Sequence, residues 1–571
     1  MPRPVKPDRP VIAEPVVEPT QGTSIVVLHP GSSTLQLGRV SDHYPHSIPH
    51  VIAHRTKENC QVVIKEDNPL VRDGIWHPES EEKRSRGYHA GNHCLQSMRI
   101  SGGYRKSKVQ MAEVSQYNSK VFPIPTDSEA GTTWTDISNN PQMLIGEHAL
   151  NLPPNAPYIC KWPIRHGQLN IHSGPGGSAT SVAADLEYLW KFAIEEYLGI
   201  SPASFNFIRV VLIVPDMFMS ANVKLMVNVL LNQLRFSCVI VHQESVCACL
   251  GAGIPSACVV DVGDQKTSVS CVEDGLSLPG SRITVNYGGS DISRCFLWLL
   301  QKSSFPYQSL DIHDKLDMQL LQELKETFCH LSFDIPAGHI HEFQVIRPHQ
   351  KILTYKLKLG DEPMLAPVSL FVPDLLGICE QKMLTFFPEQ TEFSSDDMMD
   401  DRYLLENKEK EGKKGKTDTD NTGDGLDLYS VSSYVSKKPK VVPNVKSAMS
   451  IDQAIMYSIE QCGNTETKRK MYGTILLVGG GYCFKGAEDF LLRKVQAQLP
   501  AHYQFVREQM EVVVRPKDVE PATVCWKGGT VLSILDSAQE LWISQKEWNQ
   551  YGVRILRERC AFQWSSNTDK L

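Results

Sequence analysis

Short apolar runs that end at glycine-centred turns dominate the hydrophobic pattern of this chain. In residues 257–271 the apolar run 258–260 leads into Asp261-Val-Gly263-Asp264, after which apolar and polar residues alternate. This pattern predicts a strand, a tight turn and a returning strand. Residues 24–38 repeat it, with Gly31 in the turn. The repetition predicts two similar halves, each carrying one glycine hairpin.

The elements between and after the two hairpins predict an α/β fold. Apolar residues recur at helical spacing in several segments, and continuous apolar runs indicate buried strands. Strand–helix–strand order directly before the second hairpin favours an α/β lobe. The expected helices are 181–198, about 221–235, 287–300, 316–333 and 450–461, and the expected buried strands are 210–214, 239–241 and 474–478.

We predict two lobes separated by a cleft, with two long insertions. Residues 56–140 are polar and predict irregular structure, and residues 392–445 have almost no core-forming residues, which predicts a disordered insert. The predicted organisation is a disordered tail at 1–22, a first lobe at 23–250 with its insert at 56–140, a second lobe at 251–559 with its insert at 392–445, and a tail at 560–571.

Composition narrows the classes of function. The chain has 571 residues, is 41% hydrophobic and carries a net charge of -7, so it is large enough for two cores and is not a polycation. Its 15 cysteines lack regular spacing, which favours reduced thiols in the cytosol or nucleus. We expect neither a secretory signal nor a membrane contact.

A basic cluster lies within the first insertion, at Lys83, Arg84 and Arg86 and again at 105–108. A solvated loop face is one interpretation, and a patch that contacts DNA or histones is the other.

The glycine turns carry the candidate chemistry. Successive backbone N–H groups at Gly31 and Gly263 would form a cradle for an anion, and Asp261 at a strand end would hold a hydrated divalent cation. An ordinary hairpin explains each turn alone. Two matching turns favour a phosphate chain gripped from both halves. A third turn, at 478–481, follows another buried strand and precedes Phe484.

With these three turns in this order, the chain resembles the actin fold and, in detail, the actin family. The resemblance rests on Val260-Asp-Val-Gly-Asp264, Tyr287-Gly-Gly-Ser-Asp291, Lys325-Glu326, Val478-Gly-Gly-Gly481 with Phe484, and Trp526-Lys-Gly-Gly529. It implies a site for ATP, with or without Mg²⁺. The residues that it implies for nucleotide are Ser32, Ser33, Thr34, Leu35, Gly263, Asp264, Gln265, Lys266, Thr267, Lys325, Glu326, Gly479, Gly480, Gly481 and Phe484, with Asp261 toward the metal.

The chain departs from the actin pattern at the positions that serve hydrolysis. His29 stands where actin has an acidic residue, and Ser268 where it has a histidine. The glutamine that places water in actin is matched by Gln243 or by Glu244. Since such groups each contribute about 10²–10⁴ in rate, we expect ATP to be bound with little or no hydrolysis and predict no catalytic residue.

The combined motifs, including Trp162–Asn170 and His242–Ala248, are most similar to actin-related subunits of INO-type chromatin remodellers. That resemblance implies a nuclear protein that assembles with actin, another actin-related protein and a helix of the motor subunit. It also implies contact with histones or nucleosomal DNA and roles in transcription and DNA repair. The alternatives are an active ATPase or phosphotransferase of the same superfamily and a filament-forming actin.

Overall fold

A computed structural model describes most of the chain. The described residues are 22–56, 68–71, 78–103, 109–126, 134–154, 156–348, 350–379, 384–386 and 448–560. The predictions for the tail before residue 22, for the insert at 392–445 and for residues 561–571 lie outside them.

The first lobe is built on a mixed sheet whose centre is parallel. Its strand order is β21-β11-β10-β1-β2-β3, with β1, β10 and β11 parallel and the β1–β2 hairpin antiparallel. The strands are β1 (Ile25–Pro30), β2 (Thr34–Arg39), β3 (His46–Pro49), β10 (Arg209–Val214), β11 (Cys238–Gln243) and β21 (Ile543–Ser544).

The second lobe repeats this sheet. Its order is β18-β15-β13-β12-β19-β20, with β12, β19 and β20 parallel and the β12–β13 hairpin antiparallel. The strands are β12 (Ala257–Val262), β13 (Thr267–Glu273), β14 (Leu276–Ser277), β15 (Ile283–Val285), β18 (Leu384–Phe386), β19 (Thr474–Val478) and β20 (Glu511–Val513). Each hairpin therefore has the same neighbours in its own sheet, which confirms the predicted α/β fold with duplicated halves.

Helices and small sheets surround the two large sheets. The helices are α3 (Glu147–Leu150), α4 (Ala179–Leu198), α5 (Ser220–Asn228), α7 (Gly289–Lys302), α8 (Lys315–Phe328), α9 (Glu362–Val368), α11 (Ile451–Glu460), α12 (Thr465–Gly473), α13 (Ala487–Gln498), α15 (Gln545–Tyr551) and α16 (Arg554–Arg559). The small sheets are β6-β4-β7, from Met143–Ile145, Ile52–Arg55 and Tyr158–Lys161, β8-β9, from Ile164–Arg165 and Gln168–Leu169, and β16-β17-β5, from Ile340–Val345, Ile352–Lys358 and Ile124–Thr126. None of the described helices combines the length and apolar character needed to cross a membrane.

Two helix predictions need correction at their ends. The α5 helix stops at Asn228 and continues as a π-helical turn, η3 (Val229–Gln233), instead of running unbroken to 235. The α8 helix ends at Phe328, before the predicted 333, because Cys329 takes an extended conformation.

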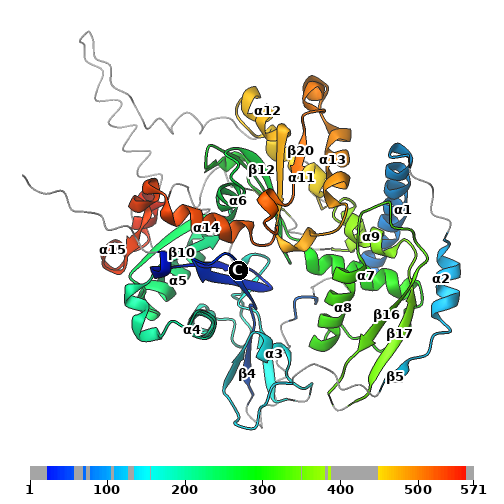
Figure 1. Cartoon of the computed structure of the whole chain (residues 1–571), viewed down its shortest axis with the longest axis horizontal. Coiled ribbons are helices and arrows are strands. Elements are labelled where there is room, and N and C mark those ends of the chain that lie inside the picture. The colour runs from blue at the N-terminus through cyan, green and yellow to red at the C-terminus, as the bar shows by residue number, and fades with distance from the viewer. Residues whose placement is uncertain are drawn as a thin grey trace, which may run out of the picture.

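Two helices pack against each other between the sheets, where the lobes meet. These are α6 (Glu244–Ala252) and α14 (Val524–Ile534), and they lie beside the central strands (Figure 1). A Cβ on Gly251 would lie 2.1 Å from the Val524 oxygen, and one on Gly528 only 1.7 Å from the Cys247 oxygen. The glycines therefore permit backbone-to-backbone packing. A shared buried cluster that includes Val27, Val259 and Trp526 joins both sheets here.

The prediction of irregular structure for 56–140 was wrong. This segment contains α1 (Pro78–Ser101), α2 (Met111–Asn118) and β5, all of which pack on the second lobe (Figure 1). The α1 helix contacts η5 (Pro373–Leu376) and α9, and β5 pairs with β17. The hydrophobic pattern of α1 is weak because small residues make its closest contacts. A Cβ on Gly87 would lie 2.2 Å from the Leu375 nitrogen.

The basic cluster lies partly on α1 and belongs to this packing. Lys83 donates to the Ile378 oxygen at 3.1 Å, and the Arg84 guanidinium lies 5.9 Å from the centre of the Trp298 ring. Arg86 pairs with Glu82 at 2.9 Å. The solvated-loop interpretation is therefore wrong for Lys83 and Arg84, and residues 105–108 lie outside the described residues.

Candidate nucleotide site

The two glycine hairpins have the same turn geometry. The Gly31 N–H donates to the Thr34 oxygen and the Gly263 N–H to the Lys266 oxygen, each at 2.9 Å. Within the described residues, the two amides that follow each glycine, those of 32 and 33 and of 264 and 265, donate to no protein acceptor. Consecutive N–H groups of this kind form an anion-binding concavity.

Buried groups hold each turn in place. The His50 Nδ1 lies 2.7 Å from the Gly31 oxygen, and burial lowers the pKa of His50 to about 4, so the neutral ring donates this hydrogen bond. The Gly289 N–H donates to the Gly263 oxygen at 3.0 Å. A Cβ on Gly481 would lie 2.2 Å from that same oxygen, so the third glycine turn packs directly on the second.

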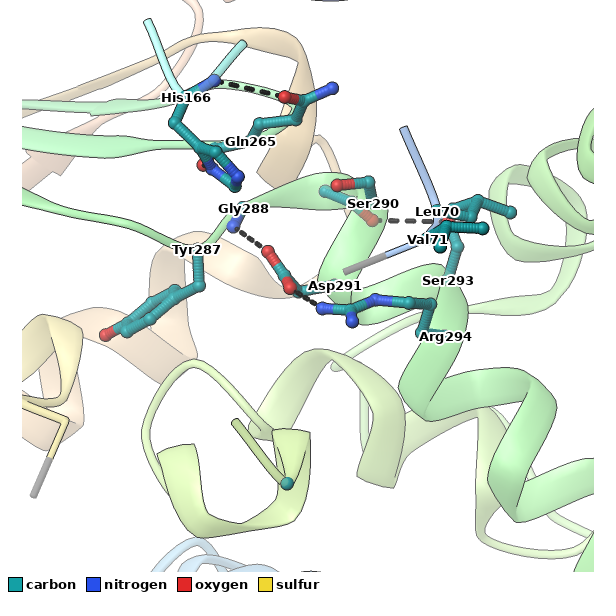
Figure 2. A network of polar contacts seen from close by, with 12 residues as sticks. Leu70, Val71, His166, Gln265, Tyr287, Gly288, Ser290, Asp291, Ser293 and Arg294 are labelled. Carbon is teal, nitrogen blue, oxygen red and sulfur yellow. Dashed lines mark hydrogen bonds and ion pairs between the residues drawn. The ribbon is translucent and has the colours of Figure 1, made fainter. Parts of the chain in front are cut away.

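A loop between β8 and β9 joins the two hairpins. The His166 N–H donates to the Gln265 Oε1 at 3.1 Å, and the His166 Nδ1 lies 3.0 Å from the Gln265 oxygen (Figure 2). The next amide, of Gly167, donates to the Ser32 Oγ at 3.3 Å. Both residues have positive φ, 48° and 71°, which turns the loop sharply enough to reach both hairpins.

The first turn of α7 fastens the second hairpin from the other side. The Ser290 N–H and Oγ both donate to the Asp264 oxygen, at 2.8 and 2.9 Å. Figure 2 shows the Asp291 carboxylate between the Gly288 N–H, at 2.9 Å, and the Arg294 guanidinium. The segment that contains Tyr287 and Gly288 is therefore fixed at both ends.

A buried charged network fills the space between the hairpins. The Lys266 Nζ lies 2.5 Å from the Glu244 Oε2, 3.4 Å from the Asp261 Oδ2 and 3.1 Å from the Ser268 Oγ. The other Glu244 oxygen lies 3.2 Å from the His29 Nε2. These groups come from β1, the start of α6, β12, β13 and the turn between β12 and β13, which carries Lys266.

Charge pairing sets the protonation of this network. Burial acts to lower the pKa of Lys266, but the carboxylates of Glu244 and Asp261 outweigh it and raise that pKa. Burial favours the neutral form of Glu244, yet Lys266 and His29 lower its pKa below the ordinary value. Burial raises the pKa of Asp261 to about 6 against the opposing effect of Lys266. Lys266 is thus paired first with Glu244, its nearer partner.

A cavity of about 680 Å³ lies beside the third glycine turn. Its lining includes Glu326, Cys483, Phe484 and Arg515. Next to Glu326, the buried Lys325 Nζ donates to the Gly289 oxygen at 3.0 Å, and the Gly289 N–H in turn donates to Gly263 of the second hairpin. Charged and apolar side chains both line this cavity, and its volume has room for a nucleoside.

The structure brings most of the predicted nucleotide residues to one region. Ser32, the residues 263–266 and Gly481 meet around the hairpins, while Glu326 and Phe484 line the cavity. Gly479 and Gly480 lie in the third turn.

Three of the predicted residues play other parts in the structure. Thr34 has an exposed side chain and Leu35 packs in the first-lobe core. Thr267 donates to the Tyr287 oxygen at 2.9 Å. Ser33 lies in the first glycine turn, and its side chain is half-buried.

Sequence reasoning missed two parts of the site. The loop at His166–Gly167 enters the sequence analysis only as part of a family motif, and the one local signal that could have found it is Gly167, since glycine marks turns. Of the two candidates for the water-placing residue, Glu244 faces Lys266, whereas the Gln243 Nε2 points to the Asp216 oxygen at 3.4 Å.

Known proteins share this architecture along nearly the whole chain. The actin family model matches residues 20–561. A protein described as actin-related protein 8 from Bos taurus is 42% identical over 583 residues, which cover 95% of this chain and 93% of that protein. The chain belongs to the actin-related protein 8 family. The human member is 41% identical over 583 residues, with the same coverage of 95% and 93%, and the Aedes aegypti member is 35% identical over 96% of this chain and 99% of that protein.

A solved member of the family has the same fold. The structure described as human actin-related protein Arp8 in its ATP-bound state superposes with a TM-score of 0.83 at 42% identity, covering 97% of this chain and 100% of that one.

Proposed function

We propose that this protein binds ATP in the cleft between its lobes, hydrolyses it little or not at all, and serves as an actin-related subunit of a nuclear INO-type chromatin remodeller. The observation that carries the nucleotide part is the convergence of two anion-binding turns beside a nucleoside-sized cavity. The human relative whose description names ATP supports the same ligand.

In this site the amides after Gly31 and Gly263 bind the phosphates from both lobes. Phe484 packs on the base, and Glu326 at the cavity edge is an acceptor for the ribose or base. The His166–Gly167 loop keeps both turns at one spacing, since it bonds to Ser32 and to Gln265.

Slow hydrolysis follows from the charged network. A general base must hold an available lone pair at the attacking water. The Glu244 carboxylate is already engaged by Lys266 and His29, and these partners lower its pKa. This argument weighs against the alternative of an active ATPase or phosphotransferase.

Nucleotide extraction and a single-turnover assay test this part together. Protein purified without added nucleotide should release ATP on denaturation. ATP held at saturation should remain uncleaved over a time in which actin cleaves its own. Extraction of ADP alone, or cleavage at the rate of actin, would contradict slow hydrolysis. An empty protein that binds no ATP would contradict the whole nucleotide proposal.

The chromatin part of the proposal rests on the resemblance of the motifs. We propose that the protein assembles with actin, a second actin-related protein and a helix of the motor subunit, that it contacts histones or nucleosomal DNA, and that it acts in transcription and DNA repair. Affinity purification of the tagged full chain from nuclear extract should recover actin and a remodeller motor in fixed proportion. Recovery of neither would contradict it.

A further inference from the structure

The donor groups between the hairpins do not suit a divalent cation. Magnesium prefers several oxygen ligands in octahedral geometry. Here the carboxylates of Asp261 and Glu244 both contact the Lys266 ammonium, and the group opposite them is the imidazole of His29. Among the described residues, no cluster of three or more His, Cys, Asp or Glu side chains is arranged to hold a metal ion.

Contacts along the side chain and at the ammonium fix the position of Lys266. Its stem crosses the loop between β8 and β9 at Gly167, where a Cβ would lie 2.4 Å from the Lys266 Cδ. Its ammonium donates to three oxygens, on Glu244, Asp261 and Ser268. A lysine ammonium has three donors, so these contacts use its full capacity and fix its place.

Lys266 also lies next to the phosphate cradle in the chain. The two amides that donate to no protein acceptor in the described second hairpin belong to the residues directly before it, Asp264 and Gln265. Lys266 therefore leaves from the same turn as the amides that would bind phosphate, while its ammonium occupies the carboxylates of Asp261 and Glu244. In nucleotide sites of related chemistry a lysine and a metal ion share this task.

We propose that the Lys266 ammonium takes the place of the divalent cation, so that this protein binds ATP without Mg²⁺. The inference rests on the proposed ATP site and concerns only its counter-ion. A divalent ion that entered the network would have to displace the ammonium from Asp261 and Glu244 and leave it buried with the Ser268 hydroxyl but no carboxylate as a partner.

Equilibrium binding of radiolabelled ATP to the full-length protein, in excess EDTA and in excess Mg²⁺, tests the proposal. The expected dissociation constants in the two buffers differ by less than about threefold, which is about 0.6 kcal/mol. ATP binding that requires Mg²⁺ would overturn the inference and leave the ATP site standing. Absence of ATP binding in both buffers would overturn both.

A pair of variants sharpens the test. Lys266→Met removes the charge and frees both carboxylates, so binding in EDTA should fall by about tenfold or more and Mg²⁺ should restore a large part of it. The exposed Lys120→Met is the matched control and should bind equally in both buffers. Equal binding by Lys266→Met and the wild type in EDTA would contradict the role of the ammonium. If Lys266→Met does not fold, the wild-type comparison alone still decides the question.

Discussion

At the scale of single residues, the site depends on glycines whose missing side chains allow backbones to touch. Gly480 and Gly481 are neighbours in the third turn, but their surroundings differ. A Cβ on Gly481 would lie 2.2 Å from the Gly263 oxygen, whereas one on Gly480 would meet its nearest heavy atom, the Ala522 Cβ, at 3.7 Å. Only the first contact joins two of the three turns.

Alanine at these two positions should therefore give different stabilities. Gly481→Ala should lower the free energy of unfolding by about 2 kcal/mol or more, because backbone must move to relieve the clash. Gly480→Ala should change it by less than about 1 kcal/mol. Urea unfolding without nucleotide measures both. Equal losses for the two variants would show that the third turn does not pack on the second hairpin.

His50 links the first hairpin to pH. Burial lowers the pKa of His50 to about 4, so the folded state favours the neutral ring. The stability that this provides is present above the ordinary histidine pKa of about 6.5 and is lost as pH falls toward about 4. At pH 5 the loss from this one residue should be about 2 kcal/mol.

His50→Gln keeps a donor for the Gly31 oxygen but does not titrate. Between pH 7 and pH 5, its free energy of unfolding should therefore fall by about 2 kcal/mol less than that of the wild type. The exposed His43→Gln serves as the control and should follow the wild-type slope. Parallel slopes for all three proteins would contradict the assignment of a neutral, buried His50.

At the scale of elements, the hairpins could be predicted because their signals are local in the sequence. Contacts between distant parts of the chain leave no such signal and could not be predicted. The β1–β2 and β12–β13 hairpins follow from apolar runs and a glycine within about a dozen residues of chain. The Lys266–Glu244 pair joins residues far apart in sequence, and it depends on where β11 ends and α6 begins. A shift of one residue at that boundary would have made Gln243 the residue facing the site.

The α1 helix was not predicted, for a different reason. Although Leu95 and Met98 are buried in the second-lobe core, much of its contact uses small and polar residues, such as Gly87 and Ser80, whose Oγ donates to the Gly377 oxygen at 2.6 Å. Hydrophobic periodicity detects a helix by its large apolar residues. A helix that approaches its neighbour through glycine and serine therefore has a polar sequence although one side of it is buried.

The α2 helix fixes the insertion to the second lobe through one buried amide. The Asn118 Nδ2 donates to the oxygens of Ser303 and Lys358, both at 3.0 Å, and its Oδ1 accepts from the Lys358 N–H at 2.9 Å. Asn118→Ala should leave these backbone groups without partners and destabilise the attachment by about 2–3 kcal/mol.

Hydrogen exchange measures this local effect. Amides of α2 and β5 should exchange faster in Asn118→Ala than in the wild type, while those of the first-lobe strands β1 and β10 should not change. Gln116→Ala, on the exposed side of the same helix, is the matched control. Unchanged exchange in α2 would show that Asn118 does not hold the helix in place.

At the scale of the whole molecule, the insertion of the first lobe fastens the two lobes together across the cleft. The Arg165 guanidinium, in β8, donates to the Asn68 and Val71 oxygens at 3.4 and 3.1 Å, and the Asn68 Nδ2 donates to the Ile312 oxygen at 2.7 Å. Further along, Arg99 on α1 pairs with Asp361 at 2.8 Å. The chain thus leaves the first lobe, binds the second at several points and returns.

This arrangement predicts that the protein does not form filaments. A helical polymer needs the same two complementary patches free on every subunit. Here α1, α2 and β5 cover an outer side of the second lobe, beside α9 and β17 (Figure 1). After incubation with ATP in polymerising salt, ultracentrifugation should leave the protein in the supernatant while actin in a parallel tube sediments. Sedimentation that increases with protein concentration above a threshold would show that the covered side is not needed for polymer contacts, and that the elements which fasten the lobes do not prevent self-assembly.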